Sequence, residues 1–177
     1  MTARDTVLIA TFAALTAVLG LLPPLPVPLV PVPITAQTMG VMLAGLMIGP
    51  RRGGLAMLLL LGVVALGIPL LAGGRGGLAV FAGPSAGYLI GWPIGAFVTG
   101  MLARGATSPA PLFAACLAGG IGVVYACGIP GVALISGISV PTAALASAAF
   151  LPGDLIKAGV ATAVAVTLRR AYPRLTP

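Results

Sequence analysis

Long apolar segments, separated by short groups of glycine, proline or arginine, account for most of this 177-residue chain. A helix needs about 20 predominantly apolar residues to cross a bilayer. The pattern predicts six spans, at residues 6–22, 34–49, 54–70, 84–103, 110–129 and 153–170. Of all residues, 59% are hydrophobic and 6% are charged, whereas a soluble domain carries about 25% charged residues. We therefore predict an all-α integral membrane protein, with residues 1–177 forming one domain of six transmembrane helices.

A proline-rich segment at residues 23–33 interrupts this pattern, with six prolines in eleven positions. Proline fixes φ and lacks an amide hydrogen, which predicts an extended and stiff segment. Extended backbone exposed to lipid would leave its carbonyl groups without partners. We expect the segment to lie at the membrane surface or to fold over a cavity as an apolar lid. A short helix is expected at residues 141–150, in the connection that precedes the last span.

The basic residues determine the predicted orientation. Seven arginines fall on one side of a six-span arrangement: Arg4, Arg51, Arg52, Arg104, Arg169, Arg170 and Arg174. Only Arg75 and Lys157 fall on the other side. Because cytoplasmic segments carry an excess of arginine and lysine, we predict cytoplasmic termini in the inner membrane and a pocket at the outer face. The net charge of +7 does not indicate nucleic-acid binding, since no aromatic-rich basic surface accompanies it.

Asp154 and Lys157 stand out because the chain has only two acidic residues and one lysine. They open the last apolar run and lie three positions apart, so they share one face of a helix. A charge in hydrocarbon costs roughly 2.5–3.5 kcal/mol near the centre of a helix and less toward its ends. Spacing alone leaves two interpretations open. Asp154 caps the helix and pairs with Lys157, or the pair binds a ligand, which is the usual role of ionisable groups in a membrane.

Other polar side chains are predicted on the same outer side: Thr35, Gln37, Ser85 and Tyr88. A carboxylate accepts hydrogen bonds and an ammonium donates them, so the charged pair suits a neutral ligand edge with a carbonyl and N–H donors, such as a cyclic urea. Arg75, in a glycine-rich loop, would meet an anionic tail. Gln37 has two open interpretations, helix–helix hydrogen bonding and ligand contact. Trp92 is interpreted as an interfacial aromatic residue.

The sequence shows no pattern for catalysis, nucleotide binding or metal binding. It has no histidine, no phosphate-binding glycine motif and no serine with an evident base, so we predict neither an enzyme nor a cofactor. Cys116 and Cys127 are interpreted as small core residues.

A single carboxylate within the spans does not make a proton relay, so uphill transport would need partner proteins. The alternative is a stand-alone secondary transporter or facilitator of a small neutral solute, which would need broken helices or an internal repeat.

Four sequence runs resemble those of the biotin-binding membrane subunit, the S component, of energy-coupling-factor vitamin transporters. They are PVPITAQT at residues 31–38, GPRRG at 49–53, GPSAGYLIG at 83–91 and PGDLIK at 152–157. The resemblance covers nearly the whole length. The third run is similar to the family's Gly-Pro-Thr-Gly-Gly-Tyr, with Ser85 and Ala86 in place of Thr and Gly.

This resemblance implies six helices, with biotin held near the outer surface under the loops between helices one and two and between helices three and four. It implies that Asp154 and Lys157 contact biotin, with Tyr88 as a further contact. A coupling transmembrane protein and two ATPase subunits would supply the energy. Four alanines of the first span match the position where the family docks on that coupling protein: Ala10, Ala13, Ala14 and Ala17. Their four-residue spacing alone indicates only close helix packing. Further ligand contacts are added on physical grounds: Thr35, Gln37, Arg75 and Ser85.

Overall fold

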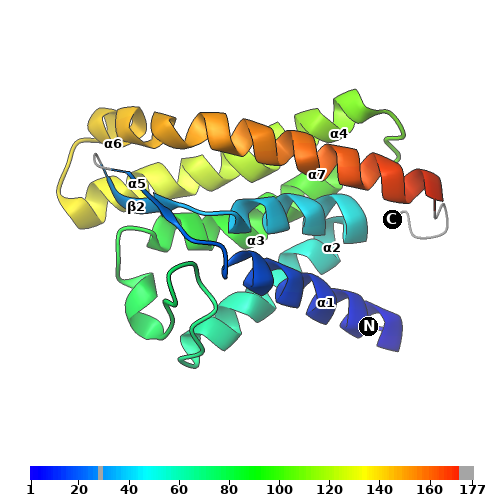
Figure 1. Ribbon diagram of the computed structural model, residues 1–177, viewed down its shortest axis with the longest axis horizontal. Coiled ribbons are helices and arrows are strands. Elements are labelled where there is room, and N and C mark those ends of the chain that lie inside the picture. The colour runs from blue at the N-terminus through cyan, green and yellow to red at the C-terminus, as the bar shows by residue number, and fades with distance from the viewer. Residues whose placement is uncertain (28–29, 172–177) are drawn as a thin grey trace.

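The computed structural model describes residues 1–27 and 30–171 (Figure 1). Its α-helices are α1 (Ala3–Leu19), α2 (Gln37–Ala65), α3 (Ala86–Leu102), α4 (Pro109–Ala115), α5 (Val124–Ser136), α6 (Val140–Ser147) and α7 (Leu151–Ala171). Shorter helical segments are η1 (Leu78–Phe81), the π-helical η2 (Cys116–Val123) and η3 (Ala148–Phe150). Two strands, β1 (Leu25–Val27) and β2 (Val30–Ile34), lie between α1 and α2. The predicted helical class is confirmed for the described residues, apart from this pair of strands.

Helix α2 covers most of the second and of the third predicted span, because helical backbone continues through the predicted connection at residues 50–53. It ends at Ala65, five residues before the predicted end of the third span. It is interrupted only at Gly49, whose φ of 79° and ψ of 178° are not helical. A positive φ favours glycine, which has no Cβ to clash, and Pro50 suits the first position of the helical segment that follows. A side chain at Gly100 of α3 would clash with the backbone of Gly49 and Pro50. Figure 1 shows the chain changing direction at this kink.

The fifth predicted span is longer than expected. Segments α4, η2 and α5 form one continuous helical stretch, Pro109–Ser136, whereas we expected the span to end before Pro130. Proline is tolerated in membrane helices when its freed carbonyl finds other partners. The stretch instead ends at Gly137, which has a left-handed conformation with φ of 66° and is a typical helix stop. The start of the predicted connection after Pro130 is therefore wrong, while α6 and η3 confirm the expected short helix at residues 141–150.

The proline-rich segment forms an antiparallel hairpin, in which Leu25 pairs with Ile34 and Val27 pairs with Val30. The predicted extended conformation is confirmed for β1 and β2. Proline is found on the edge strands of sheets, and a two-stranded sheet consists only of edges. The hairpin corrects the all-α prediction in this one region of the described chain.

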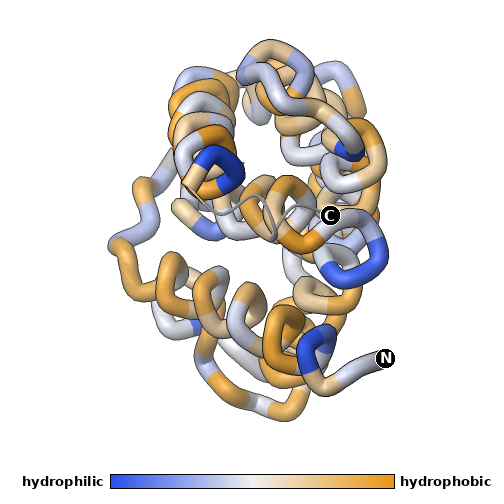
Figure 2. The backbone as a smooth tube through the Cα atoms, turned by 90° about the vertical axis from the view of Figure 1, so that its right-hand side faces the viewer, coloured by the Kyte–Doolittle hydropathy of each residue, from blue (hydrophilic) through white to orange (hydrophobic). Residues whose placement is uncertain are grey.

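Three helical stretches of the described chain are long and apolar enough to cross a membrane: Gln37–Ala65, Pro109–Ser136 and Val140–Ala171. Helix α3 is also apolar but shorter. The start of α1, the kink of α2 and the end of α7 lie at one end of the molecule (Figure 1), which carries the arginines of the predicted cytoplasmic side. Figure 2 views this end and shows strongly hydrophilic segments between hydrophobic helices. Arg174, predicted on the same side, lies outside the described residues.

Arg169, in the last turn of α7, connects three segments at this end. Its guanidinium donates hydrogen bonds to the carbonyl groups of Leu46, Ala103 and Ala106. Carbonyl groups at the C-terminal end of a helix lack intrahelical partners and carry partial negative charge. The arginine therefore stabilises the ends of α3 and of the first half of α2 against α7.

Candidate functional site

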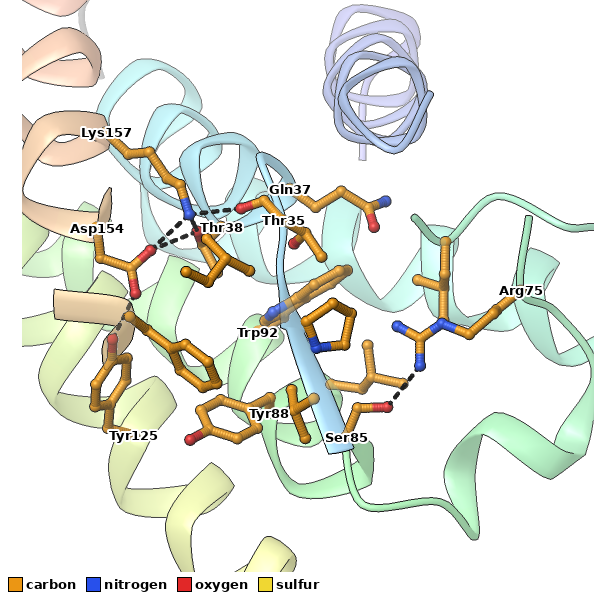
Figure 3. Close-up of a pocket in the computed structure, with 16 residues that line it drawn as sticks. Thr35, Gln37, Thr38, Arg75, Ser85, Tyr88, Trp92, Tyr125, Asp154 and Lys157 are labelled. Atoms are coloured by element: carbon orange, nitrogen blue, oxygen red, sulfur yellow. Dashed lines mark hydrogen bonds and ion pairs between the residues drawn. The ribbon is translucent and has the colours of Figure 1, made fainter. Parts of the chain in front are cut away.

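One pocket lies where β2, the loop before α3, and helices α3, α5 and α7 meet, away from the end that carries the chain termini (Figures 1 and 3). Sixteen residues line it. They include all seven predicted ligand-binding residues: Thr35, Gln37, Arg75, Ser85, Tyr88, Asp154 and Lys157. The cavity has a volume of about 50 Å³. The fold thus brings together polar residues from three distant parts of the chain.

Asp154 and Lys157 form a buried ion pair near the start of α7, with Lys157 Nζ 2.8 Å from Asp154 Oδ1. Their side chains are 4% and 15% exposed, respectively. Asp154 also accepts hydrogen bonds from Thr38 Oγ1 at 3.0 Å and from the Tyr125 hydroxyl at 2.6 Å. Lys157 donates further bonds to Thr38 Oγ1 and to the carbonyl of Thr35. Contacts from the start of α2 and from α5 therefore fix the geometry of the pair beside the pocket.

The two charged groups differ in their remaining hydrogen-bond capacity. An ammonium has three N–H donors, and Lys157 uses all three within the protein. A carboxylate has about four acceptor positions, and Asp154 uses three, only one of them at Oδ2. Asp154 therefore retains an acceptor position for a ligand N–H group, while Lys157 reaches a ligand by exchanging one bond. Because α7 begins at Leu151, Asp154 lies inside the helix and is not its capping residue.

Three aromatic rings form one wall of the pocket. The ring centroids are 5.9 Å apart for Tyr88 and Tyr125, 5.9 Å for Tyr88 and Phe150, and 6.4 Å for Tyr125 and Phe150. All three pairs have the edge-to-face geometry that aromatic quadrupoles favour. The Tyr88 hydroxyl donates to Ser147 Oγ at 2.7 Å, so Tyr88 offers its ring to the pocket.

Tyr125, Phe150 and Thr38 also line the pocket but were not predicted from the sequence. One sequence feature could have identified Tyr125 as a candidate: it is the only tyrosine besides Tyr88 within a predicted span. Its contact with Asp154 depends on how α5 is rotated against α7, which the hydrophobic pattern does not specify.

Trp92 differs from the prediction of an interfacial residue, since its side chain is 4% exposed and lines the pocket. It follows Tyr88 by four residues on α3, so both side chains lie on one helix face. The indole Nε1–H is buried without a hydrogen-bond partner among the described residues. A buried donor without a partner costs about 1–3 kcal/mol. This side chain (Figure 3) therefore provides an unused donor beside the cavity.

Arg75 and Ser85 form a second polar group, on the opposite side of the pocket from the ion pair (Figure 3). Arg75 Nη1 donates to Ser85 Oγ at 3.2 Å. Gly73 and Gly74 have φ of 78° and 70°, and they close the turn in which Arg75 pairs with Leu71. Burial lowers the pKa of the Arg75 guanidinium, which is far above neutrality in water. The glycine-rich loop therefore positions one cation at the pocket wall.

Gln37 uses its side-chain amide within the protein. Its Nε2 donates to the carbonyls of Thr16 and Leu70 at 3.1 and 3.0 Å, and its Oε1 accepts from the Ala72 amide at 2.9 Å. The residue is 1% exposed. These bonds connect the end of α1 and the loop that carries Arg75 to the start of α2. Of the two open interpretations, the geometry favours hydrogen bonding between segments.

The four alanines of α1 do not lie on one exposed face. Ala13 is 6% exposed and belongs to the core, and Ala17 is half-buried against it. Ala10 and Ala14 are exposed. Of the four alanines predicted to dock, only Ala10 and Ala14 are therefore exposed, because the other two pack against the remaining helices.

Known proteins resemble the chain over nearly its full length. Residues 1–174 match the model of the BioY family. The biotin transporter BioY of Rhizobium etli is 49% identical, over 99% of this chain and 98% of the relative. The biotin transporter BioY of Rhodobacter capsulatus is 46% identical, over 96% of this chain and 95% of the relative. The probable biotin transporter BioY of Bacillus subtilis is also 46% identical, over 94% of this chain and 91% of the relative.

A solved structure shares the fold. The crystal structure of the S-component for biotin from an ECF-type ABC transporter matches with a TM-score of 0.91 and 32% sequence identity. The match covers 96% of this chain and 95% of that chain. The described helices and hairpin therefore have the S-component arrangement.

Proposed function

We propose, because this chain belongs to the BioY family, that it captures biotin at the outer face of the cytoplasmic membrane as the substrate-binding S component of an energy-coupling-factor transporter. As a member of a transporter family, the protein is not an enzyme. The proposal rests on one observation, the placement of the charged groups around the pocket. A carboxylate with spare acceptor capacity and a guanidinium lie on opposite sides of an otherwise largely apolar and aromatic cavity.

Biotin carries groups that match both sides of the pocket. Its ureido ring has two N–H donors and a carbonyl, and its aliphatic chain ends in a carboxylate. We assign a ureido N–H to Asp154 and the ureido carbonyl to Lys157, which exchanges one of its bonds, with Thr35 beside it. The ligand carboxylate is assigned to Arg75 and Ser85. Such a site rejects ligands that leave its buried polar groups unpaired.

The remaining predicted residues have supporting roles in this proposal. The ring of Tyr88 packs against the apolar part of the ligand. Gln37 holds the loop that carries Arg75 in place through its hydrogen bonds. The indole N–H of Trp92 provides a further donor for the ligand.

Entry of biotin requires one wall of the pocket to move. The cavity of about 50 Å³ is smaller than the roughly 300–1,000 Å³ of typical ligand pockets. A two-stranded hairpin is at best marginally stable by itself, whereas the helical walls are packed into the core. We therefore assign the movement to β2, which contributes Val32, Pro33 and Ile34 to the wall.

We further propose six spans with cytoplasmic termini: α1, the two halves of α2, α3, the stretch from α4 to α5, and α7. The clustering of the arginines at one end of the molecule supports this orientation. The exposed pair Ala10 and Ala14 would dock on a coupling transmembrane protein. Two ATPase subunits would supply energy, because the sequence carries no nucleotide-binding motif of its own.

Calorimetric titration of the detergent-purified chain tests the proposed function. Biotin should bind at one site, and thiamine, a control vitamin without a cyclic urea, should give no heat of binding under the same conditions. Binding of both vitamins, or of neither, would contradict the assignment of the pocket to biotin.

A further inference from the structure

Three arginines surround a hollow at the end of the molecule that carries the chain termini. Arg51 and Arg52 follow the kink of α2, and Arg104 follows the end of α3. All three line a hollow of about 490 Å³, together with Phe97 and Met101. Arg51 and Arg104 are exposed. The hollow therefore concentrates positive charge where the helices leave the apolar layer.

The acidic side chains of the chain pair with only one of these three arginines, Arg52. Asp5 and Asp154 are the only acidic residues in the sequence. Asp154 is paired with Lys157 at the biotin pocket, and Asp5 lies 2.7 Å from Arg52. Arg51 and Arg104 thus have no carboxylate side chain left to bind. The second half of α2 also begins at the hollow, and the N-terminus of a helix adds partial positive charge.

An apolar groove continues from the hollow along α2 and α3. Arg51 and Phe97 line both the hollow and the groove. Leu58 and Ile94 form walls of the groove and are 55% and 46% exposed. Gly54 contributes no side chain to the groove, where a Cβ would lie 3.2 Å from the Pro93 carbonyl. A cationic hollow followed by an apolar groove complements an anionic head group joined to a hydrocarbon chain.

We propose that this surface, the arginine hollow with its apolar groove, binds one anionic phospholipid of the cytoplasmic leaflet. The lipid phosphate lies between Arg51 and Arg104, whose guanidinium groups offer several donors to phosphate oxygens. One acyl chain lies in the groove between α2 and α3. Basic pockets between transmembrane helices on the cytoplasmic side bind anionic lipid head groups in other membrane proteins. The proposal concerns a site distinct from the biotin pocket and does not depend on biotin binding.

Native mass spectrometry of the detergent-purified chain, equilibrated with phosphatidylglycerol and phosphatidylcholine, tests the proposal. The chain should retain one phosphatidylglycerol in preference to phosphatidylcholine. Arg51→Gln combined with Arg104→Gln should weaken that retention by roughly tenfold or more, since each cation near the head groups contributes to binding. Ile94→Trp, which fills the groove without a change of charge, should also weaken it. Arg170→Gln removes a charge from the same end outside the hollow and should leave retention unchanged.

Four outcomes would overturn the proposal. They are equal retention of the two lipids, full retention by the double variant, an equal loss in Arg170→Gln, and displacement of the lipid by glycerol phosphate at equal concentration. The last result would show an anion site that does not require an acyl chain. If the double variant retains the lipid but no longer co-purifies with the coupling protein, the hollow is a protein contact instead. The thermal unfolding midpoint and biotin binding of each variant establish that it is folded.

Discussion

Two neighbouring tyrosines of the pocket have hydroxyl groups with different partners. Tyr125 donates to the Asp154 carboxylate, whereas Tyr88 donates to Ser147. A hydrogen bond to a charged group contributes about 1.5–3 kcal/mol. Tyr125 was missed because its role depends on the packing of α5 against α7. Asp154 and Lys157 were predicted because charges are rare in membrane spans.

Tyr125→Phe should weaken biotin binding by roughly tenfold, because the carboxylate loses one of the bonds that fix its position. Tyr88→Phe is the matched control, since it removes a hydroxyl that points to Ser147, and its affinity should stay within about twofold. Calorimetric titration measures both. Equal losses in the two variants would contradict the positioning role of Tyr125.

Trp92→Phe should weaken biotin binding by roughly three- to tenfold, the effect of one lost hydrogen bond, because the ring is largely retained and the unpaired Nε1–H is lost. Trp92 is the only tryptophan of the chain. Biotin should therefore also change the intrinsic fluorescence of the unmodified protein. Unaltered fluorescence on saturation with biotin, or unaltered affinity in the variant, would remove Trp92 from the set of ligand contacts.

At the scale of elements, glycine and proline determined which boundaries were predictable. The start of the last span was predicted within two residues, since Pro152 and Gly153 precede the charged pair. Pro130 was a misleading stop, because a helix packed in a bundle continues through proline, and Gly137 is the actual one. The hairpin required pairing between two extended segments, which single-sequence patterns do not specify. The same limit applied to α1, where spacing identified four alanines but not which two face outward.

Ala10→Leu combined with Ala14→Leu should reduce co-purification with the coupling protein by roughly tenfold, because two bulky side chains prevent close helix approach. Biotin affinity should not change, since α1 contributes no residue to the pocket lining. Ala163→Leu is the control, an exposed alanine of α7. A pull-down with a tagged coupling protein measures the effect. Undiminished co-purification of the double variant would refute docking through this exposed pair.

At the scale of the whole molecule, the S-component fold places the charged pair, the aromatic wall and Arg75 around one pocket. The sequence predicted this convergence because alternating spans put all seven predicted ligand-binding residues on one side. It did not predict the small volume of the cavity, which depends on how β2 packs. It also did not identify Tyr125 and Phe150, two of the three aromatic residues that form one wall, as pocket residues.

Cysteine labelling in a variant without Cys116 and Cys127 checks the proposed topology. A membrane-impermeant thiol reagent should label Ala82→Cys in spheroplasts, whose cytoplasmic membrane is intact. It should label Thr107→Cys only after the membrane is permeabilised, because the two exposed positions lie on opposite sides in a six-span arrangement. Labelling of both positions in spheroplasts with an intact cytoplasmic membrane would contradict six spans.

Titration of biotin into Asp154→Asn and Lys157→Ala tests the central claim most directly, that the buried ion pair binds the ligand. Each substitution leaves a buried charged partner without its counterpart, so affinity should fall at least about tenfold. Asp5→Asn makes the same change at the only other acidic residue, away from the pocket, and should bind biotin as the unmodified chain does. Unchanged affinity in both pocket variants, with correct folding, would contradict the account.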